Sequence, residues 1–555
     1  MEKTWLKQYP ADMDPEISMA SSDNLVAMLE SSFVTYPDRP AFACMGRTIT
    51  YSELDHLSAA FASWLQKDSG LAAGSRIAIM MPNILQYPVA LFGALRAGMV
   101  VVNVNPLYTA RELEHQLKDS GAQAIVILEN FAATLEQVIG SSQLQRVIVT
   151  GMGDLLGFPK SAIVNLVVRR VKKMVPAFEL PGHLRIDRVL SKHRGKQPGP
   201  VDLGTESLAF LQYTGGTTGP SKGAMLTHGS VYANVLQMSA LTEPYSEPGK
   251  EIVITALPLY HIYALVVNCM CYVRLGGLNV LIPNPRDLPG FIKELAKWPF
   301  TAFYGVNTLY NALIHEPEFL KLDFSSLKQA GGGGMAVQSA VAHKWHDLTG
   351  HLLQEGYGLT ECSPVVSFNL KNQTEIFTGT VGVPLPSTEI SVRDEQGNEV
   401  PQGEPGELCV RGPQLMQGYW QREEATAEAF YEDGFLRTGD VATVDEEGRI
   451  KIVDRAKDMI LVSGFNVYPC EIEDVVTHHE GVLEAACIGV PDEKSGERVK
   501  LFVVRQPDSE VSADEIVAYC RENLTGYKVP KQVEFRDELP KTNVGKILRR
   551  ALRET

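Results

Sequence analysis

The segment YTGGTTGPSKGA, from Tyr213 to Ala224, follows the apolar run Leu208 to Leu211, and together they predict a strand ending in a phosphate-binding loop. Three glycines within five residues permit positive φ angles and let backbone N–H groups converge on an anion. Hydroxyl donors and a lysine complete the set: Thr214, Thr217, Thr218, Ser221 and Lys222. A flexible surface loop is the alternative, but the hydroxyl density, the lysine and the preceding strand favour phosphate. The Walker spacing Gly-Lys-Ser/Thr is missing, which argues against a kinase or P-loop NTPase.

The sequence before this loop alternates between helical and extended patterns. Thr50 and Glu53 form a capping-box pattern ahead of apolar residues at helical spacing. Strands are expected over 76–81, 99–104 and 124–128, and helices over 89–97 and 112–118. Alternation of this kind predicts βαβ units and a largely parallel sheet, and therefore an α/β fold.

The last hundred residues resemble a smaller α+β unit. We expect a helix over 470–478, strands near 483–490 and 499–504, and a second helix after the capping box Ser512 to Glu515. Because 555 residues exceed one ordinary core, we predict a large domain over 1–454 and a small mobile domain over 455–555.

Composition excludes several classes of protein. With 45% hydrophobic and 21% charged residues the chain is not mainly disordered, and a net charge of −15 argues against nucleic-acid binding. The eight cysteines form no Cys-x-x-Cys pair, and the start of the chain has no signal-peptide pattern, so a reduced cytoplasmic location is expected. The uncharged runs 77–95 and 252–273 contain prolines and polar residues, so we interpret them as buried strand–helix segments rather than membrane spans.

Five further motifs follow the loop in order. They are Tyr357-Gly-Leu-Thr-Glu361, Thr438-Gly-Asp440, Asp454-Arg455, Ser463-Gly-Phe465 and Pro540-Lys-Thr-Asn-Val-Gly-Lys546. Taken together with the loop, they make the whole chain resemble the adenylate-forming superfamily, and most closely its bacterial long-chain fatty acid–CoA ligases. One departure is Ala456, where a lysine is common, although Arg455 and Lys457 flank it.

The resemblance implies a two-step reaction. A fatty acid carboxylate and ATP give an acyl-adenylate and pyrophosphate, and CoA then displaces AMP. Lys546, Glu361 and Thr214 are implied to be catalytic, with Thr214 and Glu361 also holding Mg²⁺. The implied nucleotide contacts are Tyr213, Thr214, Gly215, Gly216, Thr217, Thr218, Gly219, Lys222, Gly333, Gly356, Tyr357, Gly358, Thr360, Asp440, Arg455 and Lys546.

Three further sets of residues complete the hypothesis. His261, Tyr263 and Gly305 are candidates for the acyl pocket, and Ser463, Gly464 and Phe465 for the CoA channel. Lys457 matches the hinge about which the family rotates its small domain. The glycines 331–334, framed by Ala330 and Met335, are interpreted as a strand end entering a helix.

The segment 155–178 is locally basic and has a helical stripe of Ile163, Val167, Val171, Met174 and Phe178. It fits a peripheral contact on the inner face of the cell membrane, and a core-packed helix with a solvated basic face is the alternative. A homodimer is a second hypothesis about assembly.

Other functions remain open at this point. A medium-chain or aryl-acid CoA ligase is the nearest rival within the class, and a non-catalytic membrane-associated acyl-binding protein is the rival from another class. A peptide-synthetase adenylation domain is disfavoured, because no carrier domain is expected after Thr555.

Overall fold

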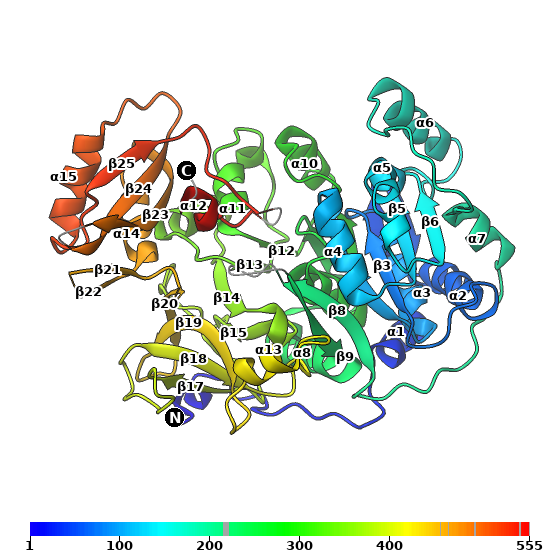
Figure 1. The fold of residues 1–555 in the computed structure, drawn as a ribbon, viewed down its shortest axis with the longest axis horizontal. Coiled ribbons are helices and arrows are strands. Elements are labelled where there is room, and N and C mark those ends of the chain that lie inside the picture. Colours follow the sequence, from blue (N-terminus) through cyan, green and yellow to red (C-terminus); the bar gives the residue numbers. More distant parts are fainter. Residues whose placement is uncertain (215–220, 456, 464, 493–494, 543–544, 554–555) are drawn as a thin grey trace.

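Two large sheets and two smaller ones organise the chain (Figure 1). The structure is a computed structural model that describes residues 1–214, 221–455, 457–463, 465–492, 495–542 and 545–553. Both large sheets lie in the N-terminal three quarters, and the five-stranded sheet is built by the last hundred residues (Figure 1).

The first large sheet has seven strands in the order β7-β6-β5-β3-β4-β8-β9. All neighbours are parallel except β8 and β9, which are antiparallel and flank the predicted phosphate loop in the sequence. The strands are β3 (Arg76–Met80), β4 (Val100–Asn103), β5 (Ala124–Leu128), β6 (Arg146–Thr150), β7 (Leu184–Arg185), β8 (Leu208–Thr214) and β9 (Lys222–Thr227). The predicted strands at 76–81, 99–104 and 124–128 are confirmed.

Its helices also follow the sequence pattern. The capping box of Thr50 and Glu53 forms as expected and opens α2 (Tyr51–Lys67). The helices predicted over 89–97 and 112–118 are α3 (Gln86–Arg96) and α4 (Ala110–Ser120), each longer than expected. The remaining helices on this side are α1 (Leu25–Thr35), α5 (Ala132–Glu136), α6 (Lys160–Leu166) and α7 (Ile186–Lys192).

The second large sheet has nine strands in the order β16-β15-β14-β13-β12-β10-β11-β1-β2, parallel in its centre and antiparallel at both ends. The strands are β1 (Pro40–Cys44), β2 (Arg47–Thr50), β10 (Ile252–Thr255), β11 (Leu278–Leu281), β12 (Ala302–Gly305), β13 (Gln329–Gly333), β14 (Gln354–Gly358), β15 (Val365–Phe368) and β16 (Val383–Pro384). Its helices are α8 (His228–Thr242), the π-helix η6 (Ala264–Met270), α9 (Cys271–Arg274), α10 (Leu288–Leu295), α11 (Asn307–Leu313) and α12 (Ser339–Thr349).

The glycine run ends β13, as expected, but the helix does not begin directly after it. Gly334 has a φ of +77°, and α12 starts only at Ser339. The left-handed glycine breaks the strand direction, so the chain bends between Gly334 and the helix.

Both uncharged runs are buried strand–helix segments, as predicted. The first forms β3 and α3, and the second forms β10, η6 and α9. Among the described residues, no helix has the length and apolar character that crossing a membrane requires.

The two smaller sheets follow each other along the chain. The first is antiparallel, with β17 (Glu389–Arg393), β18 (Gly406–Arg411), β19 (Leu436–Val444) and β20 (Ile450–Arg455). The second contains β21 (Ile460–Val462), β22 (Phe465–Val467), β23 (Val482–Asp492), β24 (Gly496–Arg505) and β25 (Gln532–Phe535). Helices α14 (Pro469–Thr477), α15 (Ala513–Asn523) and α16 (Arg549–Arg553) complete this small domain.

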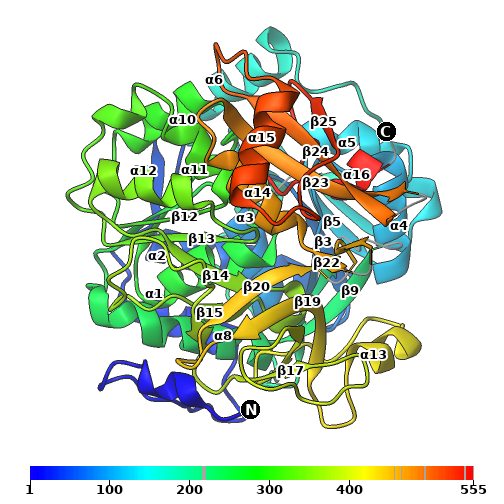
Figure 2. The ribbon, with the colours of Figure 1, turned by 90° about the vertical axis from the view of Figure 1, so that its left-hand side faces the viewer.

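The predicted helices and strands of the small domain are confirmed, including the Ser512 capping box of α15. Figure 2 shows this domain above the antiparallel sheet, with β20 leading up to it. The predicted domain boundary falls at Arg455, the last residue of β20, and β21 of the small domain begins at Ile460.

Candidate functional site

One cavity of about 860 Å³ lies where both large sheets, the antiparallel sheet and the small domain meet. Most of the predicted site residues that the structure describes line it: Tyr213, Thr214, Lys222, His261, Tyr263, Gly333, Gly356, Tyr357, Gly358, Thr360, Glu361, Asp440, Arg455, Lys457 and Lys546. They come from the carboxyl ends of β8, β13 and β14, from β19 and β20, and from the small domain. In α/β sheets this strand edge is where ligands bind.

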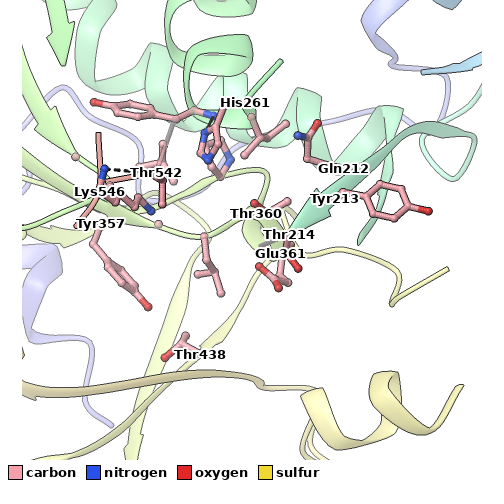
Figure 3. Close-up of a pocket in the computed structure, with 18 of the residues that line it drawn as sticks. Gln212, Tyr213, Thr214, His261, Tyr357, Thr360, Glu361, Thr438, Thr542 and Lys546 are labelled. Carbon is pink, nitrogen blue, oxygen red and sulfur yellow. Dashed lines mark hydrogen bonds between the residues drawn. The ribbon is translucent and has the colours of Figure 1, made fainter. Parts of the chain in front are cut away.

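The phosphate-loop hairpin supplies one wall. Thr214 ends β8 and Lys222 begins β9, paired across the loop. The Tyr213 ring points away from Thr214 and Glu361 (Figure 3). Its hydroxyl donates a 2.7 Å hydrogen bond to Oδ2 of Asp119. This residue therefore anchors the hairpin to α4 through its side chain. The predicted contacts Gly215, Gly216, Thr217, Thr218 and Gly219 lie outside the described residues.

Glu361 and Thr214 lie together beside Thr360 (Figure 3). The residue that holds this group belongs to none of the sequence motifs. Tyr419 donates a 2.7 Å hydrogen bond from its hydroxyl to Oε1 of Glu361, and the Lys222 ammonium lies 5.1 Å from the centre of its ring. Tyr419 reaches the site because its backbone pairs with Ala224 of β9. The two residues are far apart in the sequence, so no local pattern predicts this contact.

A second polar group forms on the opposite wall. The Tyr357 hydroxyl donates a 2.6 Å hydrogen bond to Oδ2 of Asp440, and Arg455 Nε lies 3.3 Å from Oδ1. Burial raises the pKa of Asp440, and the positive charge of Arg455 opposes that rise. Thr438 to Asp440 are part of β19 rather than a free turn, so the carboxylate is held in place by strand pairing.

Lys546 enters from the small domain. Its side chain reaches the glycine run: a methyl group added at Gly334 would lie 3.2 Å from Lys546 Cε. Burial, followed by the nearby charge of Arg455, lowers the pKa of Lys546 to about 8. Thr308 Oγ1 donates a 3.2 Å hydrogen bond to the Gly545 carbonyl, and Asn311 donates one of 3.2 Å to the Leu483 carbonyl. These two contacts hold the small domain against α11.

His261 lies between Lys546 and Gln212 (Figure 3). Burial and the charge of Lys546 lower the pKa of His261 to about 3, so its imidazole is neutral near pH 7. The cavity is also lined by apolar side chains that no sequence motif marks, namely Met238, Val267, Val365 and Phe368. They are spread over α8, η6 and β15, and their own patterns mark them only as core residues.

Three predictions do not fall in this cavity. Gly305 is not among the described residues that line it; an added methyl group there would meet Tyr310 at 3.0 Å. Ser463 and Phe465 lie on the β21–β22 hairpin of the small domain, where the Phe465 ring stacks on Tyr527 with centroids 4.7 Å apart. Gly464 lies outside the described residues.

Comparisons with known proteins agree with this arrangement. The family model described as AMP-binding enzyme matches residues 29–420, and the AMP-binding enzyme C-terminal domain matches 471–546. The chain is 58% identical to a long-chain-fatty-acid–CoA ligase of Escherichia coli O6:H1, covering 100% of this chain and 98% of that protein. It is 52% identical to the protein of that name from Haemophilus influenzae, with the same coverage.

Solved structures share the architecture. ATP-bound MatB from Rhodopseudomonas palustris superposes with a TM-score of 0.81 at 28% identity, covering 96% of this chain and 98% of that one. A benzoate CoA ligase from Burkholderia xenovorans LB400 gives a TM-score of 0.82 at 26% identity, covering 96% and 99%. On the strength of its motifs, its fold and these full-length matches, the chain belongs to the AMP-binding enzyme family, the adenylate-forming enzymes that its motifs resemble.

Proposed function

We propose that this chain is an ATP-dependent ligase that joins long-chain fatty acids to CoA through an acyl-adenylate. The observation that carries the proposal is the position of Lys546. It reaches from the small domain into the same cavity as Lys222, Glu361 and Asp440. Relatives that match the whole chain are named for this reaction, which supports the same conclusion.

In the first half-reaction a carboxylate oxygen bonds to the α-phosphorus of ATP, and the bond between that phosphorus and the departing pyrophosphate breaks. Both reactants are anions, so the site must above all hold positive charge in position before the reactants meet. Lys222 and the phosphate loop hold the pyrophosphate portion, and the Lys546 ammonium lies at the glycine run, where the α-phosphate and carboxylate meet. Asp440 accepts hydrogen bonds from the ribose hydroxyls, as acidic residues do in dinucleotide sites.

The residues around Glu361 fit a magnesium ion. Mg²⁺ takes hard oxygen ligands and is usually held by one or two carboxylates together with substrate phosphates. Glu361 supplies the carboxylate and Thr214 a hydroxyl, with Tyr419 fixing one carboxylate oxygen. When bound, the ion neutralises charge on the phosphates.

In the second half-reaction the CoA sulfur bonds to the acyl carbon and the bond to AMP breaks, while the thiol proton is lost to solvent. Lys546 and its segment occupy the site in the present arrangement, so the small domain rotates about Lys457 before CoA enters. That rotation brings Ser463, Gly464 and Phe465 toward the acyl-adenylate. A rotation of this kind excludes water in the first step and admits the thiol in the second.

A shorter or aromatic acid is the rival substrate. The chain is also 36% identical to a feruloyl-CoA synthase of Amycolatopsis, covering 92% of this chain and 94% of that protein. The apolar lining of Met238, Val267 and Phe368 suits an alkyl chain, and His261 and Tyr263 line the same cavity. ATP–pyrophosphate exchange over a panel of carboxylic acids tests the proposal. We expect exchange that is fastest with long-chain acids. If none of the acids supports exchange, the proposal is contradicted.

The segment 155–178 supports a peripheral contact with an anionic membrane. The helix is only partly packed on the core: Val168 is buried, whereas Phe158 is 90% exposed and Val171 71%, and Ile163, Leu166 and Met174 are also exposed. The helical stripe is shorter than predicted, because α6 and its π-helical continuation η4 (Val167–Val171) end before Met174. Arg170, Lys172 and Lys173 are exposed beside these apolar side chains.

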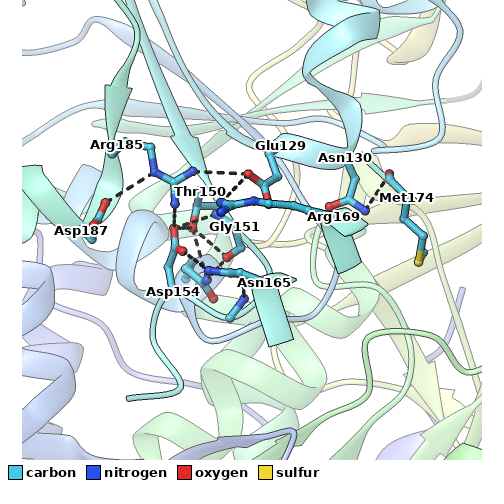
Figure 4. Close-up of polar contacts among 12 residues, drawn as sticks. Glu129, Asn130, Thr150, Gly151, Asp154, Asn165, Arg169, Met174, Arg185 and Asp187 are labelled. Atoms are coloured by element: carbon cyan, nitrogen blue, oxygen red, sulfur yellow. Dashed lines mark hydrogen bonds and ion pairs between the residues drawn. The ribbon is translucent and has the colours of Figure 1, made fainter. Parts of the chain in front are cut away.

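One of the four basic residues at 169–173 has a structural role instead. Arg169 pairs with both oxygens of the buried Glu129 at 2.8 Å, and Asn165 donates a 2.9 Å hydrogen bond to Asp154 (Figure 4). These contacts hold the helix against the large domain, and Ile163, Leu166 and Val171 remain exposed. A symmetric contact between two copies would bring like charges together, whereas an anionic bilayer attracts them, by about 1 kcal/mol per basic residue.

The test replaces Arg170, Lys172 and Lys173 with Glu and leaves Arg169 intact. Binding to phosphatidylglycerol vesicles should be lost, while a control reversal at the exposed Lys7, Lys196 and Lys293 should retain it. Equal binding by both variants would contradict the contact. The homodimer stays a prediction, which light scattering would measure.

A further inference from the structure

The guanidinium of Arg549 contacts three acidic side chains and the thiol of Cys470. In the small domain it pairs with Glu473, with Nη2 2.7 Å from Oε2 and Nε 3.1 Å from Oε1. Its Nη1 lies 3.3 Å from Oδ2 of Asp458 and 3.5 Å from Oδ1 of Asp454. The arginine side chain is 16% exposed, so most of this charge is removed from water and its partners matter.

The two aspartates stand on opposite sides of the hinge. Asp454 belongs to β20 of the antiparallel sheet, whereas Asp458 follows Lys457 on the path to β21. Asp454 is 2% exposed, and its Oδ2 accepts a 3.0 Å hydrogen bond from the backbone N–H of Cys470 in α14. The small domain therefore contacts Asp454 twice, through Arg549 and through the first turn of α14.

The same arginine lies close to the catalytic lysine in the chain. Lys546 donates its backbone N–H to Thr542 Oγ1 at 3.0 Å, and Arg549 begins α16 directly after this turn. Whatever fixes Arg549 therefore also limits where Lys546 can lie. If the domain rotates about Lys457, Asp458 and Glu473 travel with Arg549 and Asp454 does not. The contacts of Asp454 are the ones that such a rotation breaks.

We propose that Asp454 and Arg549 form a latch across the hinge, which holds the small domain where Lys546 enters the site and must open before the second half-reaction. Asp454 is thus a positioning residue that acts through Arg549 and α14. The inference rests on the proposed two-step function, because only an enzyme that moves its small domain between steps needs a contact on one side of the hinge.

The test measures the two half-reactions separately in the full-length protein. Asp454→Asn keeps an acceptor for the Cys470 N–H and removes the charge that faces Arg549. The rate of adenylation, measured as pyrophosphate exchange with a long-chain acid, should fall on the order of tenfold. That is a common size for a coupling between two states. Thioester formation from supplied acyl-adenylate should be unchanged or faster.

Asp458→Asn is the matched control, because it also removes a carboxylate from Arg549 but on the small-domain side. It should change both half-reactions by the same factor. Arg549→Lys, which keeps the charge but cannot reach all partners, should show the same bias as Asp454→Asn. Thermal unfolding of each variant separates a latch from a loss of fold.

Two outcomes would overturn the latch: equal losses of both half-reactions in Asp454→Asn, or the same bias in Asp458→Asn. Either result would leave the proposed function standing if the unmodified protein still exchanges pyrophosphate. The absence of exchange in the unmodified protein would instead overturn the proposed function itself.

Discussion

Tyr419 donates a 2.7 Å hydrogen bond from its hydroxyl to Oε1 of Glu361, joining the connection between β18 and β19 of the antiparallel sheet to the carboxylate assigned to Mg²⁺. The same ring lies beneath the Lys222 ammonium, 5.1 Å from centroid to nitrogen. One aromatic side chain thus positions both the proposed metal ligand and the proposed pyrophosphate ligand.

Tyr419→Phe should raise the Mg²⁺ concentration needed for half-maximal pyrophosphate exchange. The ring and its contact with Lys222 remain, but Glu361 loses a hydrogen bond of the kind worth about 1.5–3 kcal/mol, so an increase of roughly ten- to hundredfold is expected. Tyr431→Phe, at a ring that packs on Arg393 away from the cavity, is the control. An unchanged Mg²⁺ dependence would contradict the assignment.

Lys546→Ala should abolish acyl-adenylate formation and leave thioester formation from supplied acyl-adenylate largely intact. The amine acts at the glycine run only while the small domain is in the present arrangement. Single-turnover measurements of each half-reaction provide the test. Equal loss of both would argue against two arrangements of the domain.

The adenylation rate should fall as the pH rises through about 8. Burial and Arg455 lower the pKa of Lys546 to about 8, so its ammonium is present below that pH and lost above it. The profile of kcat/KM for adenylation reports the free enzyme and should show this limb. Thioester formation should lack it, and a shared limb in both steps would contradict the assignment to Lys546.

Gly334→Ala should impair adenylation more than thioester formation. Gly334 has a φ of +77°, and an added methyl group would lie 3.2 Å from Lys546 Cε. Gly350→Ala is a matched control, because its φ is +72° and nothing lies within 4 Å of the added methyl group. Both variants bear a similar left-handed strain of about 1–2 kcal/mol, so only the first should bias the half-reactions.

The large domain should become less stable as the pH rises toward 8, because the buried Glu355 loses its proton. Burial raises its pKa from 4.5 to about 8, while the Val337 N–H donates to its Oε2 at 3.0 Å. The folded state therefore binds this proton more tightly than the unfolded chain, and stability is lost across that window by on the order of a few kcal/mol.

Glu355→Gln keeps an acceptor for Val337 and removes the titration. Melting temperatures measured from pH 5 to pH 8 should decline less for this variant than for the unmodified protein. Glu404→Gln, the same change at an exposed residue, should follow the unmodified protein. Parallel profiles for all three would contradict a buried, proton-binding Glu355.

The local elements were predicted well where one short stretch contains the whole signal. The capping boxes at Thr50 and Ser512 and the apolar strand Ala124–Leu128 formed as expected, because capping and strand burial depend on neighbouring residues. The helix expected directly after the glycines was wrong, since the left-handed Gly334 turns the chain away first.

Site residues with a motif were likewise found from the sequence, but their partners were not. Asp440 and Arg455 are adjacent because β19 and β20 pair, and Tyr357 reaches Asp440 from another sheet. Met238, Val267 and Phe368 carry only the ordinary pattern of buried residues, so nothing local distinguishes a cavity wall from a core.

By itself, the sequence determined the α/β class and the two-part organisation, and it predicts a phosphate loop at Tyr213 to Ala224, because each depends on residues close together in the chain. Only the tertiary structure decided that Tyr419 holds Glu361, that Arg169 is a structural ion pair with Glu129, and that Arg549 faces Asp454 across the hinge. Those contacts join residues far apart in sequence, and their partners are selected by how the sheets and domains pack.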